Sequence, residues 1–184
     1  FTFPHKLKNG QIRIVDVYSS PISYHNSSAL FSIIFDVTKR EDAFKEIDNK
    51  QALLNSLINS TPDLIFFKNT KNLYLGCNKA FEEFIGKKEA EIVGQTDFDL
   101  FSVELASRFR NMDTEVLESK RPQRRDELNI TTNGYLADYD TLKAPYFDAR
   151  GELVGLIGIS RDITERKIRE EEIVYISNHD YLTG

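Results

Sequence analysis

The sequence predicts an α+β fold, in which a five-stranded antiparallel sheet is covered on one face by short helices and flanked by two longer helices. Two observations predict it. First, residues 61–163 contain two strand patterns, a run of short helical patterns and three more strand patterns, an order typical of such a sheet. Second, the 184 residues are 40% hydrophobic, which is enough for a globular core.

The first half of this domain follows from local signals. Residues 64–68 and 73–77 are short apolar runs, and the polar residues 69–72 between them predict a hairpin. Asn78 is a candidate N-cap for a helix that follows at once. Gly86 is the candidate residue that ends this helix.

The second half contains two further helices and three strands. A short helix is expected at residues 88–93, and apolar spacing predicts a longer one at residues 102–118, before Pro122. Strand patterns separated by turn residues then complete the sheet, at residues 127–131, 135–144 and 153–159, with turns at Asn133-Gly134 and 148–151.

An internal repeat with unequal copies organises the whole chain. Residues 9–38 read as a shortened version of residues 133–164, since each has Asn-Gly, a proline eleven positions later and an Asp-x-Thr ending. The first copy has two residues fewer between proline and aspartate, a deletion that a turn between strands tolerates. Both copies are therefore expected to form the same supersecondary unit. We expect the chain to be a fragment that begins inside one domain and contains a complete second one.

Composition excludes several classes of protein. The net charge is −5 and no long basic run occurs, which argues against nucleic-acid binding. Cys77 is the sole cysteine, so a disulfide framework and a thiolate metal site are both excluded. A reducing, cytoplasmic location is the expectation. No apolar stretch is long enough for a membrane helix, so no membrane contact is expected within the fragment, although its parent could be anchored upstream.

Residues 52–166 resemble a PAS domain. Four motifs carry the resemblance together: the strand-to-helix junction at residues 73–81, the segment 94–101, a turn at Pro145, and the ending Gly158-x-x-Arg161-Asp162-Ile163-Thr164-Glu165-Arg166. Residues 1–40 resemble the last three strands of a preceding PAS domain. The final His179-Asp180-Tyr181-Leu182-Thr183-Gly184 resembles the opening of a GGDEF diguanylate cyclase domain.

The resemblance implies five parts and a regulatory function. The parts are the strands of a truncated PAS domain at 1–37, a linker helix at 38–60, a complete PAS domain at 61–163, an output helix at 164–178 and the start of a truncated GGDEF domain at 179–184. The implied function is a sensory module that binds a small molecule, or relays a conformational signal through helical linkers, to a downstream diguanylate cyclase. Two alternatives stay open: a ligand-free dimerisation spacer and the PAS sensor of a histidine kinase.

The fragment is not expected to be an enzyme, because no nucleophile and base form a recognisable pair. Asp97 and Asp99 lie in a loop and are interpreted as helix caps. The parent protein is expected to be a diguanylate cyclase, but the catalytic part of that domain is absent from the sequence. This fragment should therefore make no cyclic dinucleotide.

In the PAS family the pocket lies between the sheet and the short helices, which makes six residues candidate ligand contacts: Phe67, Tyr74, Phe109, Met112, Tyr139 and Thr141. The same side chains would suit a filled core, and both readings stay open. A histidine-ligated haem is not expected, because His5, His25 and His179 lie outside the complete domain. A photoreceptor-type flavin is not expected either, since Cys77 precedes Asn78 at a strand end and is interpreted as a core residue.

The Asp-x-Thr endings are candidate signal-relay sites, because each joins a last strand to an exit helix. Short oxygen-bearing side chains there can accept from the free amides of the helix. Thr38 with Glu41, and Asp162 with Glu165, suggest capping boxes. The four candidate relay residues are Asp36, Thr38, Asp162 and Thr164.

The helix at 38–60 carries a two-heptad seam: Phe44, Ile47, Gln51, Leu54 and Ile58. Such a seam predicts pairing with another helix, and a homodimer through helices 38–60 and 164–178 is expected. The alternative is that the stripe packs on its own sheet. The truncated copy should expose apolar side chains that need cover from a second chain or from this helix: Ile12, Ile14, Val17, Leu30, Ile33 and Phe35.

Overall fold

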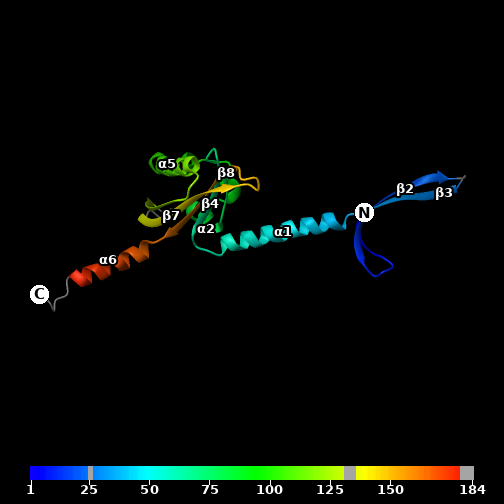
Figure 1. The fold of residues 1–184 in the computed structure, drawn as a ribbon, viewed down its shortest axis with the longest axis horizontal. Helices are drawn as coiled ribbons and strands as arrows, with labels where there is room; N and C mark the ends of the chain where they lie inside the picture. The colour runs from blue at the N-terminus through cyan, green and yellow to red at the C-terminus, as the bar shows by residue number, and fades with distance from the viewer. Residues whose placement is uncertain (25–26, 131–135, 179–184) are drawn as a thin grey trace. The chain divides into compact units, whose positions relative to one another are not determined.

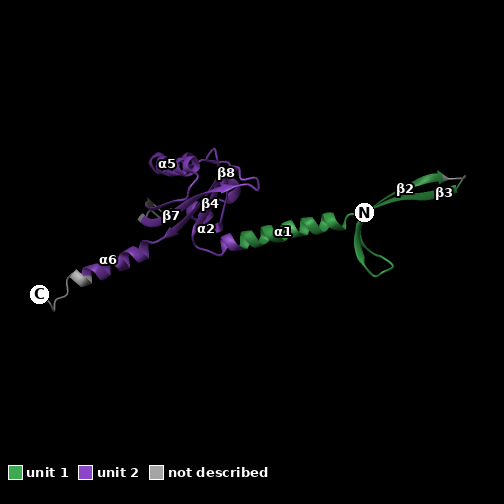
Figure 2. Cartoon of the chain, viewed as in Figure 1, with its two compact units in different colours: residues 1–56 green, residues 57–184 purple. Residues whose placement is uncertain are grey.

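The computed structural model describes residues 1–24, 27–130 and 136–178. It divides into two compact units, Phe1–Ser56 and Leu57–Gly184, which Figure 2 shows in green and purple. The expected turn at Asn133-Gly134 includes residues outside the described ones, and so does the whole segment 179–184. Each unit is described by itself.

The second unit is built on a five-stranded antiparallel sheet, and this confirms the predicted fold class. Its strand order is β5-β4-β8-β7-β6, with the N-terminal hairpin at one side and the C-terminal meander at the other. The strands are β4 Leu64–Asn69, β5 Tyr74–Cys77, β6 Gln123–Ile130, β7 Leu136–Phe147 and β8 Leu153–Asp162.

Four helices connect β5 to β6 (Figure 1): α2 Lys79–Ile85, α3 Glu89–Ile92, α4 Asp97–Leu100 and α5 Val103–Ser119. Of these, α4 was not predicted. The helices and the inner side of the sheet enclose a core whose buried members are Phe66, Tyr74, Cys77, Phe81, Ile92, Val116 and Leu156. Gly158 makes room for this core, because a Cβ there would lie 2.1 Å from the Phe66 ring.

The predicted caps of α2 are confirmed. Asn78 Oδ1 accepts hydrogen bonds from the backbone amides of Phe81 and Ile65, each at 3.0 Å, so one side chain begins the helix and holds the neighbouring strand. Gly86 ends the helix with φ of +74°, a left-handed conformation that glycine adopts without strain. The local sequence signals were sufficient here because the partners are close in sequence or in the sheet.

The first unit contains a three-stranded antiparallel sheet in the order β1-β2-β3, followed by a helix. Its elements are β1 Thr2–Lys6, β2 Ile12–Tyr24, β3 Ser27–Asp36 and α1 Thr38–Asn59, whose last turn belongs to the second unit. The helix α6, Thr164–Asn178, follows the second sheet in the same way.

The two copies of the repeat pair their strands in the same register. Pro21 lies opposite Leu30 in the first sheet, as Pro145 lies opposite Leu156 in the second. The two-residue difference between the copies therefore falls between these paired positions. The expected turn at Pro145 is wrong, because this proline lies within β7 and the chain reverses later, at Asp148–Gly151.

The first sheet leaves most of its apolar side chains exposed within the single chain. Ile12 and Leu30 are 61% and 69% exposed, and Ile33 and Phe35 are exposed as well, whereas Val15 is buried. Helix α1 has no buried residue. Among the described helices, none has a stretch both long and apolar enough to span a membrane.

Candidate functional site

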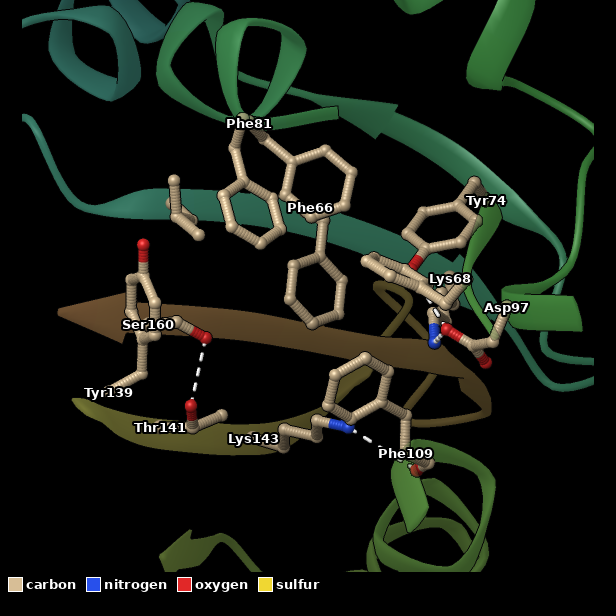
Figure 3. Close-up of a pocket in the computed structure, with 13 residues that line it drawn as sticks. Phe66, Lys68, Tyr74, Phe81, Asp97, Phe109, Tyr139, Thr141, Lys143 and Ser160 are labelled. Atoms are coloured by element: carbon tan, nitrogen blue, oxygen red, sulfur yellow. Dashed lines mark hydrogen bonds and ion pairs between the residues drawn. The ribbon is translucent and has the colours of Figure 1, made fainter. Parts of the chain in front are cut away.

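A small cavity lies between the sheet and the helices of the second unit (Figure 3). The space inside it is about 30 Å³, enough for a water molecule without any rearrangement. Most of the wall is aromatic, and the polar groups gather at two places. The lining residues are Leu64, Phe66, Lys68, Tyr74, Phe81, Phe84, Asp97, Phe101, Phe109, Tyr139, Thr141, Lys143 and Ser160.

Two lysines and two aspartates form a buried ion cluster at one end of the cavity. Lys68 Nζ lies 2.5 Å from Asp97 Oδ1 and 2.6 Å from Asp113 Oδ2. Lys143 Nζ lies 2.6 Å from the other oxygen of Asp113. None of the four side chains is more than 2% exposed. Because the charges balance, the cluster avoids the large cost of an isolated buried charge.

The ion cluster joins five elements that are far apart in sequence. Lys68 comes from β4, Asp97 from α4, Asp113 from α5 and Lys143 from β7. Tyr74 of β5 adds a fifth, since its hydroxyl donates to Asp97 Oδ1 at 2.9 Å. The cluster therefore fixes the short helices to the inner face of the sheet by directional contacts.

The same charges shift two pKa values in opposite ways. Burial alone would raise the pKa of Asp113, but the positive charges of Lys68 and Lys143 outweigh it and hold that pKa below its usual value. Burial and the negative charge of Asp97 raise the pKa of Tyr74 well above its usual value. The tyrosine therefore stays a neutral donor at physiological pH.

One oxygen of the cluster has no hydrogen-bond partner. Asp97 Oδ2 is buried without a donor, whereas Asp97 Oδ1 accepts from both Lys68 and Tyr74. Asp97 is a cavity-lining residue with no exposed surface. Since buried carboxylate oxygens are normally satisfied, this atom marks a place for a donor from water or a ligand.

The other polar place in the cavity is a pair of hydroxyl groups. Thr141 Oγ1 lies 2.9 Å from Ser160 Oγ, across the β7–β8 pairing, and Figure 3 shows this pair beside Tyr139. Aromatic rings close the remaining sides. The ring centroids of Phe66 and Phe81 are 5.2 Å apart, and those of Phe101 and Phe109 are 5.1 Å apart.

Four of the six residues predicted for the pocket wall line this cavity: Tyr74, Phe109, Tyr139 and Thr141. Phe67 does not, because side chains alternate along β4 and the inner positions are those of Phe66 and Lys68. Phe67 lies instead with Leu75, Tyr146 and Ile157 in a separate surface groove. Met112 is fully buried but does not line the cavity.

Sequence reasoning missed the ion cluster. It interpreted Asp97 and Asp99 alike as helix caps, yet only Asp99 has a capping contact, accepting from the Thr96 amide at 2.7 Å. Asp97 belongs to the buried cluster. A signal was present in β4 and β7, where Lys68 continues the alternate positions of Phe66 and Lys143 those of Thr141.

The exit of the second unit is held by β7. Thr164 Oγ1 accepts from the amide of Asp138 at 3.0 Å, and the amide of Ile163 donates to the Asp138 carbonyl at 2.8 Å. Lys167 Nζ lies 3.1 Å from the Asp138 carboxylate. Asp162 Oδ1 accepts from the Thr164 amide at 2.9 Å. The start of α6 is thus bonded directly to a strand that also lines the cavity.

The first copy repeats this exit. Thr38 Oγ1 accepts from the amide of Ile14 at 2.9 Å, and Asp36 Oδ1 accepts from the amide of Thr38 at 3.0 Å. The expected capping boxes are therefore wrong. The threonine hydroxyl is used by the neighbouring strand, and Glu41 and Glu165 accept from Arg40 and Arg169 instead.

Cys77 is buried in the core, at 6% exposure. Burial, with smaller contributions from nearby glutamates, raises the pKa of its thiol to about 12. The thiol is therefore protonated and a poor nucleophile. Across the described part of the chain, no three histidine, cysteine, aspartate or glutamate side chains are grouped so as to hold a metal ion.

The chain belongs to the PAS fold family, whose sequence profile matches residues 58–168. The aerobic respiration control sensor protein ArcB of Escherichia coli is 31% identical over 136 residues, which are 74% of this chain and 17% of ArcB. A diguanylate cyclase of Vibrio cholerae is 29% identical over 153 residues, covering 82% of this chain and 47% of the cyclase. The methanogenesis regulatory histidine kinase FilI of Methanothrix harundinacea is 32% identical over 112 residues, 61% of this chain and 12% of FilI. The chain thus spans less than half of each of these relatives.

Solved structures support the same fold. The PAS domain of Bordetella pertussis BvgS is 26% identical with a TM-score of 0.53, over 70% of this chain and 96% of that domain. A phage VqmA–DPO complex has 24% identity and a TM-score of 0.58, over 72% of this chain and 62% of VqmA. The chain therefore contains a sensory PAS domain of the kind found in histidine kinases and in a diguanylate cyclase.

Proposed function

We propose that this chain is a sensory and regulatory module that binds a small molecule in the Asp97 cavity and passes its state through α6 to a downstream diguanylate cyclase domain. One observation carries the proposal. Tyr139, Thr141 and Lys143 of β7 line the cavity, while Asp138 of the same strand bonds to Thr164 at the start of α6. A shift of this strand is therefore felt at both places.

The cyclase output rests on two sequence comparisons. Residues 179–184 resemble the opening of a GGDEF domain, and the relative from Vibrio cholerae is named a diguanylate cyclase. Such enzymes condense two GTP molecules between two facing domains, so the geometry of a dimer can control them. We accordingly propose a homodimer through α1 and α6, and a cytoplasmic location, where GTP is present.

Native mass spectrometry of the purified chain tests the sensor. A small mass that is present in the native spectrum and lost on denaturation would identify a bound molecule. A stable dimer with no such mass would contradict ligand sensing and favour the alternative of a ligand-free spacer that relays a signal from upstream.

The alternative output is a histidine kinase, because FilI, one of the relatives, carries that name. The full-length parent protein distinguishes the two. Incubation with GTP should yield cyclic di-GMP, and incubation with ATP should leave no phosphohistidine. The reverse pair of results would assign the module to a kinase and would leave the PAS sensor itself in place.

A further inference from the structure

The proposed sensor cavity has features that restrict the chemistry of its ligand. From these features, and resting on the proposed sensory function, we infer that the cavity binds an uncharged molecule, no larger than one small ring, that donates an N–H or O–H to Asp97 Oδ2. Charge, hydrogen bonding and the shape of the wall each contribute a separate restriction.

The unsatisfied oxygen defines the required donor. Within the described part of the chain, four buried side-chain atoms lack a partner, on Arg13, Asn72, Asp97 and Arg110, and only Asp97 lines the cavity. Leaving a buried acceptor unpaired costs about 1–3 kcal/mol. A ligand that brings a donor to Asp97 Oδ2 recovers this cost, and a ligand without one does not.

The ion cluster restricts the charge of the ligand. Lys68 and Lys143 already balance Asp97 and Asp113, and all four are buried. A cationic ligand would leave one buried positive charge without a counter-charge. An anionic ligand would leave a negative one, and it would face the free oxygen of Asp97. Because an uncompensated buried charge is strongly unfavourable, a neutral ligand is favoured over either ion.

The wall restricts shape and size. Phe66 and Phe81 are buried and form a fixed side, whereas Phe84, Phe101 and Phe109 on the opposite side are only partly buried. The present space of about 30 Å³ takes a water molecule, so a ring enters only if the partly buried aromatic side chains turn outward. Flat aromatic surfaces favour a flat ligand.

The test uses four single-ring probes and the 184-residue chain. The neutral donor 2-pyridone is compared with N-methyl-2-pyridone, which lacks the N–H, and with benzoate and benzylammonium as the two ions. Binding is followed by protein-detected NMR at the backbone amides of Asp97 and Thr141. We expect 2-pyridone to bind about tenfold more tightly than its N-methyl form, the value of one hydrogen bond, and neither ion to bind.

Two variants locate the contact. Asp97→Asn replaces the free acceptor by an amide group and should abolish the tenfold preference for 2-pyridone. Asp99→Asn is the matched control, because Asp99 is exposed in the same helix and does not line the cavity, and it should keep the preference. If Asp97→Asn does not fold, the comparison of the two pyridones on the unmodified chain decides alone.

Several results would overturn the inference. Equal affinity for the two pyridones would remove the donor requirement, and tighter binding of benzoate or benzylammonium would remove the charge restriction; both would leave the proposed sensor standing. No binding of any probe, with a single water on Asp97 Oδ2 in a crystal structure, would show that water satisfies the site. That last result would also leave relay through α6 intact, because the relay contacts do not depend on this oxygen.

Discussion

Asp113 is the residue on which the buried cluster depends, because its two carboxylate oxygens each accept from a different lysine. Asp113→Asn would leave Lys68 and Lys143 with one counter-charge between them. Breaking a buried pair from one side typically costs about 3–5 kcal/mol of stability. Urea denaturation followed by circular dichroism should show a loss of this size in the free energy of unfolding.

The control for this substitution is Glu118→Gln, which makes the same chemical change on the same helix at an exposed position. It should leave the free energy of unfolding within the error of the measurement. A loss in Asp113→Asn no greater than in Glu118→Gln would mean that the cluster does not stabilise the fold.

Asp113 also predicts a dependence of stability on acid. Since its pKa in the folded chain is held below the usual value of 3.8, the charged carboxylate stabilises the fold above that value, and this contribution is lost as pH falls through the lower, folded pKa. The difference in unfolding free energy between wild type and Asp113→Asn should therefore narrow on acidification. Parallel curves from neutral pH to strong acid would contradict this.

The sequence predicted side chains whose position follows from one strand, and missed those that depend on several elements. Tyr139 and Thr141 were placed on the cavity side of β7, as the structure has them. In β4 the choice of Phe67 was displaced by one residue, which reverses the face. A lysine in that pattern reads as a strand end, and only its partners on α4 and α5 make Lys68 a core residue.

At the scale of the element, the strand-to-helix exit is the part that connects sensing to output. Thr164→Val keeps the shape of the side chain but leaves the Asp138 amide without its acceptor. The expected loss is about 1–3 kcal/mol for an unsatisfied amide, concentrated in faster hydrogen exchange in the first turn of α6. Hydrogen-exchange mass spectrometry of the peptides around residues 136–147 and 163–170 measures it.

Thr164→Ser is the control for the exit, because serine keeps the hydroxyl acceptor. Its exchange should match that of the wild type. If valine and serine behave alike, the hydroxyl contact does not hold α6 to β7.

Helix ends show which local signals suffice. The Asn78 and Gly86 caps were predicted because their partners lie in the helix itself. The capping boxes at Thr38 and Asp162 were wrong, because a neighbouring strand takes the threonine hydroxyl and tertiary contact overrides the local motif. The pairing register of the repeat, by contrast, was implicit in the fixed spacing to Pro21 and Pro145.

At the scale of the whole molecule, the exposed seam of α1 predicts a dimer. Phe44, Ile47 and Leu54 are each more than half exposed in the single chain. Ile47→Glu places a charge in the seam and should shift the chain from dimer to monomer in sedimentation equilibrium. Asn49→Glu adds the same charge at the outermost position of the heptad and should leave the dimer intact. A monomeric wild type at micromolar concentration would contradict the proposed dimer.

The most direct test of the central claim, that the cavity and α6 communicate through β7, is hydrogen exchange of the chain with and without the small molecule that denaturation releases. Amides at residues 163–167 should exchange at a different rate in the two states, while those of the β4–β5 turn at residues 69–73 stay the same. Unchanged exchange throughout residues 163–167, with the cavity shown to be occupied, would contradict the account.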